Sequence, residues 1–126
     1  MNMALNIFEQ FDKNVSLVSK IMESADTGVE DIEPYLVEIL QIIKDNPDQK
    51  KQFINKFINF LKMGSAVPLE IFWYCMHDLK WSEVYEAVEH YKNSSSDLRL
   101  KRAAELILDA FSDDWEDAMM FERYRS

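Results

Sequence analysis

The chain contains very little glycine, proline or cysteine. Its 126 residues include 2 Gly, 3 Pro and 1 Cys, well below ordinary usage. Because β-sandwiches and barrels need many turn residues, this scarcity argues against them and against a glycine-rich phosphate-binding loop. The single cysteine, Cys75, excludes an intramolecular disulfide framework and a cysteine-based zinc cluster. A chain of this length is the size of one domain, with enough apolar surface to form a core without disulfides or metal.

Basic residues and long apolar segments are also scarce. The chain has 14 Lys and Arg against 23 Asp and Glu, a formal net charge of −9. Phosphate and anionic membrane surfaces require clustered Lys and Arg, so we expect neither a nucleic acid nor a membrane as a ligand. A basic protein partner would be attracted over a long range. The alternative is that the acidity only keeps the protein soluble.

The longest uninterrupted apolar segment is Ile71–Met76, which is too short to span a bilayer. The first residues contain neither a basic region nor a long apolar region, so we predict no signal peptide. These features predict a cytoplasmic protein.

Apolar residues recur at helical spacing along nearly the whole chain, and strand-like alternation is almost absent. The sequence therefore predicts an all-α fold of about seven helices in one domain over residues 1–126. The expected helices run from Ala4 to about Ser24, from near Ile32 to Asn46, from Pro47 to about Gly64, from Pro68 to about Leu79, from Ser82 to the loop Asn93–Asp97, from that loop to about Phe111, and from Asp113 to about Tyr124. Short connections favour antiparallel neighbours, so we expect stacked αα-hairpins in an irregular bundle or a short solenoid.

Several residues predict where these helices begin and end. Gly28 follows the first helix and is free to adopt a positive φ. Asn46 is expected to cap the third helix, with Pro47 as its first residue. Ser82 is expected to cap the fifth helix, with Trp81 as half of a hydrophobic staple.

No catalytic motif is present. The two histidines, His77 and His90, lie on separate predicted helices and lack the spacing of a helical zinc pair. The adjacent Asp78 cannot orient His77 on a helix, so we expect His77 to satisfy a local hydrogen bond. Cys75 lies in an aromatic segment and is expected to be a buried, inert thiol. We therefore predict no catalytic residue, no metal and no cofactor. An enzyme remains an alternative only through carboxylates that meet in three dimensions.

The acidic residues form two stretches. The first has no basic residue between Ala103 and Phe121, and it contains Glu105, Asp109, Asp113, Asp114, Glu116 and Asp117. It lacks the spacing of a calcium loop. Four of its acids flank Trp115, and an aromatic ring among acids suits a hot spot for a basic partner. The alternative is a solvated helix start, capped by Ser112, with Trp115 in the core.

The second acidic stretch lies between Lys20 and Lys44, and it contains Glu23, Asp26, Glu30, Asp31, Glu33 and Glu38. If both stretches lie on one side of the molecule, they form one extended negative face. The basic residues form no equivalent site. Arg99, Lys101 and Arg102 fall in the first turn of a predicted helix, where the dipole disfavours cations, which suggests an ion pair with another helix.

Three short segments, Pro68–Glu70, His77–Glu83 and Asp113–Asp117, resemble a pattern in small acidic bacterial helical proteins. Some of these are similar to the immunity proteins of contact-dependent and polymorphic toxin systems. The resemblance covers the second half of the chain. It implies a single-domain cytoplasmic inhibitor that neutralises a toxin domain, commonly a basic nuclease, by covering its active site or an adjacent surface. It transfers no functional residues, because such interfaces diverge between pairs.

The first functional hypothesis is therefore a non-enzymatic protein–protein inhibitor that binds a basic toxin domain. The residues expected to bind the partner are the acids Asp113, Asp114, Glu116 and Asp117, with Trp115 and Trp81 as anchors. The alternative is a helical scaffold or regulatory adaptor that binds a peptide or partner helix in an apolar groove. The 7 Met, 3 Trp, 5 Tyr and 8 Phe motivate this alternative. The sequence predicts no particular oligomeric state.

Overall fold

The computed structural model describes residues 3–24, 26–63 and 67–125. Within these ranges it contains six α-helices, three short 3₁₀ turns and no strand, which confirms the predicted all-α fold. The helices are α1 (Met3–Met22), α2 (Val29–Asp45), α3 (Lys50–Met63), α4 (Leu69–Leu79), α5 (Ser82–Ser94) and α6 (Leu98–Asp109). The 3₁₀ turns are η1 (Pro47–Gln49), η3 (Glu116–Met120) and η4 (Glu122–Tyr124).

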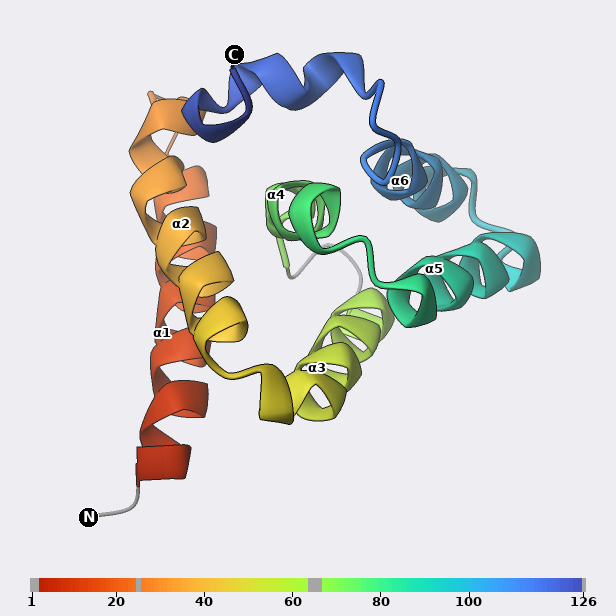
Figure 1. Cartoon of the computed structure of the whole chain (residues 1–126). Coiled ribbons are helices and arrows are strands. Elements are labelled where there is room, and N and C mark those ends of the chain that lie inside the picture. Colours follow the sequence, from red (N-terminus) through yellow and green to blue (C-terminus); the bar gives the residue numbers. More distant parts are fainter. Residues whose placement is uncertain (1–2, 25, 64–66, 126) are drawn as a thin grey trace.

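The helices are arranged around α4, which is seen almost end-on at the centre of Figure 1. Helices α1 and α2 form an antiparallel hairpin on one side of it, and α5 and α6 form a second hairpin on the other. Between the two hairpins, α3 packs along α5. The C-terminal segment, residues 110–125, runs from the end of α6 back to the start of α2. Two of the expected hairpins therefore form. The other helices and the C-terminal segment make a ring, and α4 lies inside this ring.

The central position of α4 follows from its composition. Its apolar residues form an almost continuous segment, and five of them, Ile71, Phe72, Tyr74, Cys75 and Met76, are at most 2% exposed. A helix that is apolar on all sides has to be covered on all sides. The segment Ile71–Met76 is thus the sequence signal for the buried central helix.

Aromatic side chains pack along α4 in two groups. In the first, the Phe57 ring on α3 meets the rings of Phe11, Phe72 and Trp81 with centroids 5.3–6.3 Å apart. In the second, Tyr74 on α4 meets Phe121 and Tyr124 of the C-terminal segment at 5.0 and 5.3 Å. The first group joins α1, α3 and α4, and the second attaches the C-terminal segment to α4.

The predicted helix from Asp113 to Tyr124 is wrong, because this region forms the turns η3 and η4 instead. The backbone is extended at Trp115 and Phe121, with ψ of 109° and 132°. In an α-helix, residues six positions apart differ by about 600° in rotation, which leaves their side chains about 120° apart, so a helix could not point both rings straight at α4. The extended backbone at Trp115 and Phe121 turns both rings towards α4. A short 3₁₀ turn comes after each of these two residues.

Three of the predicted helix boundaries also differ in detail. Gly28 precedes α2 with φ −118°, so it does not use the positive φ that is open to glycine, and its N–H donates to the Asp31 carboxylate at 2.9 Å. Asn46 occupies the capping position before η1, with Pro47 first as expected, but its side chain donates to the Ile42 carbonyl at 2.8 Å and makes no capping hydrogen bond. Trp81 itself occupies the capping position of α5 and Ser82 is already helical, because the Trp81 ring packs into the core. The expected end near Gly64 lies outside the described residues.

We expect Phe57→Ala to destabilise the protein by about 3–5 kcal/mol, because it leaves a cavity where α1, α3 and α4 meet. Urea unfolding followed by far-UV circular dichroism measures this loss. The matched control is Tyr85→Ala on α5, since Tyr85 is 36% exposed and its ring meets only Phe111 among the described aromatic rings. Equal losses for the two variants would contradict the placement of Phe57 at the centre of the core.

Candidate functional site

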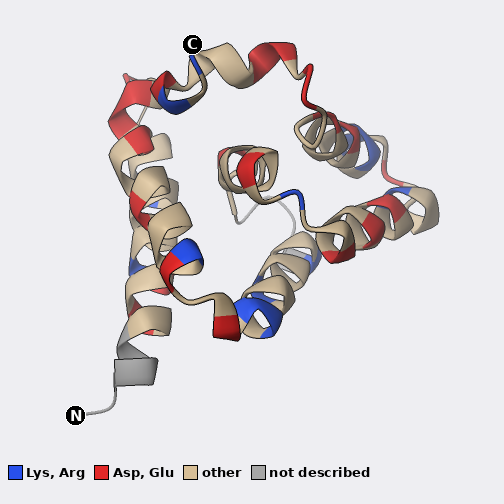
Figure 2. Cartoon of the chain, viewed as in Figure 1, with Lys and Arg blue, Asp and Glu red and all other residues tan. Residues whose placement is uncertain are grey.

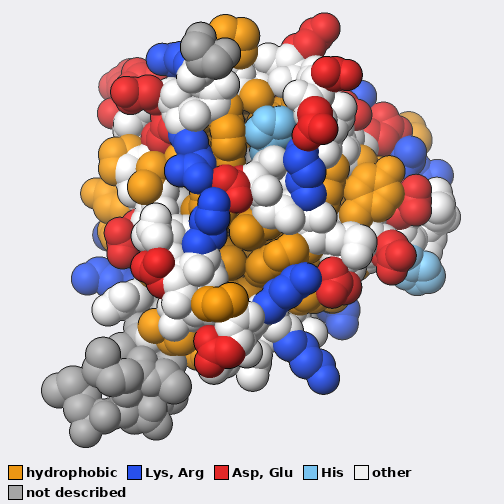
Figure 3. Space-filling model, viewed as in Figure 1, with side chains coloured by type: hydrophobic (Ala, Val, Ile, Leu, Met, Phe, Trp, Pro, Cys, Tyr) orange, Lys and Arg blue, Asp and Glu red, His pale blue; other side chains and the backbone are white. Residues whose placement is uncertain are grey.

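Parts of the two acidic stretches lie along one edge of the molecule, at the start of α2 and along the C-terminal segment (Figure 2). We call this surface the acidic edge. Its exposed members are Glu30, Asp31, Asp113, Asp114, Glu116, Asp117 and Glu122. Red side chains also gather towards this edge in the space-filling view (Figure 3). The four acids that flank Trp115 are all exposed, as a partner-binding role requires.

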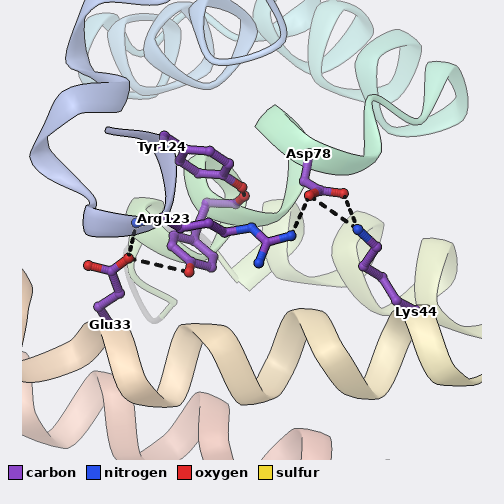
Figure 4. A network of polar contacts seen from close by, with 6 residues as sticks. Glu33, Lys44, Asp78, Arg123 and Tyr124 are labelled. Carbon is purple, nitrogen blue, oxygen red and sulfur yellow. Dashed lines mark hydrogen bonds and ion pairs between the residues drawn. The ribbon is translucent and has the colours of Figure 1, made fainter. Parts of the chain in front are cut away.

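Glu33 joins the two acidic stretches. Its carboxylate, on α2, accepts hydrogen bonds from the backbone N–H groups of Glu122 at 2.9 Å and Arg123 at 3.0 Å (Figure 4). The Tyr74 hydroxyl donates to the same carboxylate at 3.4 Å. Glu33 is therefore a structural acid that holds the C-terminal segment against α2. Through this contact, stretches far apart in the sequence share one edge.

A shallow depression lies within the acidic edge. It has a volume of about 420 Å³ and is lined by the carboxylates of Asp109, Asp114, Glu116 and Asp117 together with Ser112, Leu108 and Trp115. The Ser112 hydroxyl accepts a hydrogen bond from the Asp114 N–H at 3.2 Å, which fixes the turn after α6.

Most of the charge around this depression is not compensated. Of the four acids that flank Trp115, Asp113 pairs with Lys80 at 3.0 Å. In the described part of the chain, Asp114, Glu116 and Asp117 have no ion-pair partner. Their negative charge is available to a group in the depression or on a partner.

Trp115 and Trp81 are both only 9% exposed. The Trp115 ring lies 5.1 Å from the His77 ring and 6.2 Å from the Trp73 ring, so it packs onto α4. The Trp81 ring packs against Phe57, and Lys50 lies over it at 5.7 Å. Trp115 contributes to the wall of the acidic depression and Trp81 does not. As these rings lie, a partner could touch only their edges.

A polar network that the sequence analysis missed lies at the C-terminal end of α4 (Figure 4). Asp78 accepts hydrogen bonds from Arg123 at 2.8 Å and from Lys44 at 3.1 Å, and its side chain is 18% exposed. Burial alone would raise the pKa of Asp78, but the bonds from Arg123 and Lys44 outweigh it and hold that pKa below its usual range. The Tyr124 hydroxyl donates to the Tyr74 carbonyl. We call these contacts, together with those of Glu33, the C-terminal latch.

The polar groups of the latch are engaged in hydrogen bonds with one another. Burial raises the pKa of both Tyr74 and Tyr124, so neither phenol ionises near neutral pH. His77 donates from Nδ1 to the Ala110 carbonyl at 2.8 Å, which is the kind of hydrogen bond expected for it. Cys75 is fully buried, which confirms the expected burial, and this burial raises the pKa of its thiol.

Metal binding and membrane crossing each place their own demands on the described residues. Within them, no group of three His, Cys, Asp or Glu side chains is placed to hold a metal ion. Over the same ranges, no helix combines the length and apolarity that a membrane crossing requires. Down the middle of the face seen in Figure 3, blue and red side chains meet in pairs and leave no large basic patch on that face. The acidic edge is therefore the strongest candidate for a functional surface.

We expect Asp78→Asn to lower the free energy of unfolding by about 1–2 kcal/mol at neutral pH. This loss lies between those measured for exposed and for buried ion pairs, because the Asp78 side chain is only partly exposed. Because the pKa of Asp78 is lowered in the folded state, its stabilisation is present above about pH 4 and is lost as the pH falls through the folded value. The difference between wild type and variant should therefore shrink in acid. Urea unfolding at several pH values measures it. Asp113→Asn, which removes an exposed pair with Lys80, is the control and should change little.

We expect Trp115→Ala to lower the melting temperature, at a cost of about 3–5 kcal/mol, because the ring packs onto α4 beside Trp73 and His77. Trp115→Phe should recover much of that loss, since it keeps an apolar ring in place. Thermal unfolding of the two variants measures the effect. An unchanged melting temperature for Trp115→Ala would mean that the ring does not support the core.

No protein-family model, curated protein sequence or solved structure matches this chain. The case for a function therefore depends on the exposed carboxylates, the depression and the latch themselves.

Proposed function

We propose that this protein is a cytoplasmic, non-enzymatic inhibitor that binds a basic protein domain through its acidic edge. The observation that carries this proposal is the contact of Glu33 with the C-terminal segment, which unites two acidic stretches on one side. The resemblance to immunity proteins suggests the class of partner, a toxin domain, commonly a basic nuclease. An inhibitor of this kind works by covering a surface, so it needs no catalytic group of its own.

The charge of the edge suits the capture of such a partner. The protein carries a formal net charge of −9, and the exposed acids of the edge concentrate part of it on one side. Electrostatic attraction sums over all these charges and accelerates association, although salt screens it beyond about 8 Å under physiological conditions. Each exposed ion pair adds little affinity alone, about 0–1 kcal/mol. The edge should therefore act mainly on the association rate.

The depression offers a place for one basic side chain of the partner. A guanidinium group there could form charge-assisted hydrogen bonds with Asp114, Glu116 and Asp117, which have no ion pair in the described residues. The accessible edge of the Trp115 ring lies in the same wall and offers an apolar contact. In this interpretation the Trp115 ring forms part of the wall of the depression, and the carboxylates make the specific contacts with the partner.

The adaptor hypothesis has a less complete counterpart in the structure. An apolar pocket of about 260 Å³ lies between the ends of α3 and α5, the start of α4, and α6. Recognition of a helix requires a groove that receives side chains from several successive turns. This pocket is smaller than the ~300–1,000 Å³ of typical drug-sized ligand sites. Its size suits a small group, so the acidic edge remains the better basis for a protein-binding function.

We expect the triple variant Asp114→Asn, Glu116→Gln, Asp117→Asn to slow association with the basic partner by roughly tenfold or more at low salt. The difference should shrink at high salt, because screening removes the attraction that the variant lacks. Stopped-flow mixing measures the rate with the product of the adjacent upstream gene, which also serves as the candidate toxin in a coexpression rescue assay.

The matched control is the triple variant Glu9→Gln, Glu86→Gln, Glu89→Gln. It changes the net charge by the same amount at exposed positions on α1 and α5. If both triple variants slow association equally, the net charge matters and the acidic edge does not. If the upstream gene product neither copurifies nor loses toxicity on coexpression, the inhibitor proposal fails for that partner class.

A further inference from the structure

The apolar pocket lies towards the start of α6, whereas the acidic depression lies beyond its end. The most buried residues that line the apolar pocket are Phe72, Ala104 and Ile107, each about 2% exposed. Ala103 and Ala104 present only methyl groups to it, so α6 leaves a volume of about 260 Å³ unfilled. The interior of the pocket is thus apolar.

The mouth of the pocket is different in kind. Arg99 lines it and is exposed, and the half-buried Tyr91 lines it from α5. Within the described ranges, the Arg99 guanidinium forms no ion pair and the Tyr91 hydroxyl forms no hydrogen bond. One positive group and one hydroxyl therefore remain available beside the apolar interior.

Within the residues that the structure describes, no contact explains the position of Arg99. It lies in the first turn of α6, where the helix dipole disfavours a cation. Arg102 pairs with Glu105 of the same helix at 3.3 Å, so the expected ion pair with another helix is wrong for Arg102. The carboxylate nearest in sequence to Arg99, Asp97, is occupied as the helix cap and accepts the Arg99 N–H at 2.9 Å. The charge of Arg99 is thus complementary to an anion outside the chain.

We infer that this pocket binds the anion of a short fatty acid, with its alkyl chain in the apolar interior and its carboxylate at Arg99. At ~30 Å³ for each water-sized group, the volume of about 260 Å³ holds roughly eight or nine such groups, the size of octanoate. The guanidinium matches a carboxylate in charge and geometry, and the Tyr91 hydroxyl is a further donor beside it. In a chain of net charge −9, Arg99 supplies the local attraction that an anionic ligand needs.

Calorimetric titration of the full chain with octanoate, octanol and octylammonium tests this inference, because the three probes share one chain and differ in charge. We expect octanoate to bind about tenfold more tightly than octanol, and octylammonium to bind most weakly. Arg99→Gln should remove the preference for octanoate over octanol. Arg102→Gln, on the same helix with its guanidinium already paired, should preserve that preference.

Ala103→Phe fills the pocket and should abolish binding of all three probes, while circular dichroism checks that the variant folds. If it does not fold, the comparison of Arg99→Gln with Arg102→Gln still decides the question. Equal binding of the three probes, octanoate binding that survives Arg99→Gln unchanged, or no octanoate binding would overturn the inference. Self-association that Ala103→Phe removes, without octanoate binding, would also overturn it and assign the pocket to a second copy of the chain.

Discussion

The apolar surface of α4 is the constraint on which the rest of the structure depends. Its buried side chains spread over more than half of the helix circumference, and the partly buried rings of Trp73 and His77 meet Trp115 on the remaining side, so no single neighbour could cover it. The chain meets this requirement by placing α2 on one side, α6 on another and the C-terminal segment across the remaining gap (Figure 1). Stacked hairpins alone would suit helices with one apolar stripe. The central helix instead requires a ring, and the last residues of the chain complete it.

The polar end of α4 fixes how that ring closes. His77, Asp78 and Lys80 follow the apolar segment. His77 and Lys80 donate to the carbonyls of Ala110 and Phe111 just after α6, whereas Asp78 pairs with Lys44 and Arg123. A carboxylate near the end of a helix is unfavourable by itself, because the dipole there is negative. Two cations, Lys44 from α2 and Arg123 from the C-terminal segment, reverse this at Asp78. The same contacts set the path of the C-terminal segment and so determine where its acids emerge.

The helical periodicity allowed the fold class and most helices to be predicted, because each helix buries a stripe that local spacing reveals. The C-terminal segment was mispredicted, since its caps and charges suit a helix but its rings must reach α4 from positions that a helix would point apart. The latch had no local signal, because Asp78 and Arg123 are 45 positions apart in the sequence. The exposure of the acids flanking Trp115 could be anticipated from composition. Their position beside the start of α2 depends on the hydrogen bond from Glu122 to Glu33. The sequence did not distinguish Glu33 from the exposed acids around it.

The burial of Trp115 affects how the acidic edge can work as a binding surface. The ring is held against α4, so its acidic neighbours in the sequence, Asp114 and Glu116, are directed towards solvent. A surface whose carboxylates are already oriented loses less conformational entropy on binding than one whose segment must first become ordered. In the proposed inhibitor, Trp115 would therefore strengthen binding without contacting the partner, because it fixes the carboxylates that are proposed to do so. The short segment Asp113–Asp117 therefore contributes Trp115 to the hydrophobic core and its carboxylates to the acidic edge.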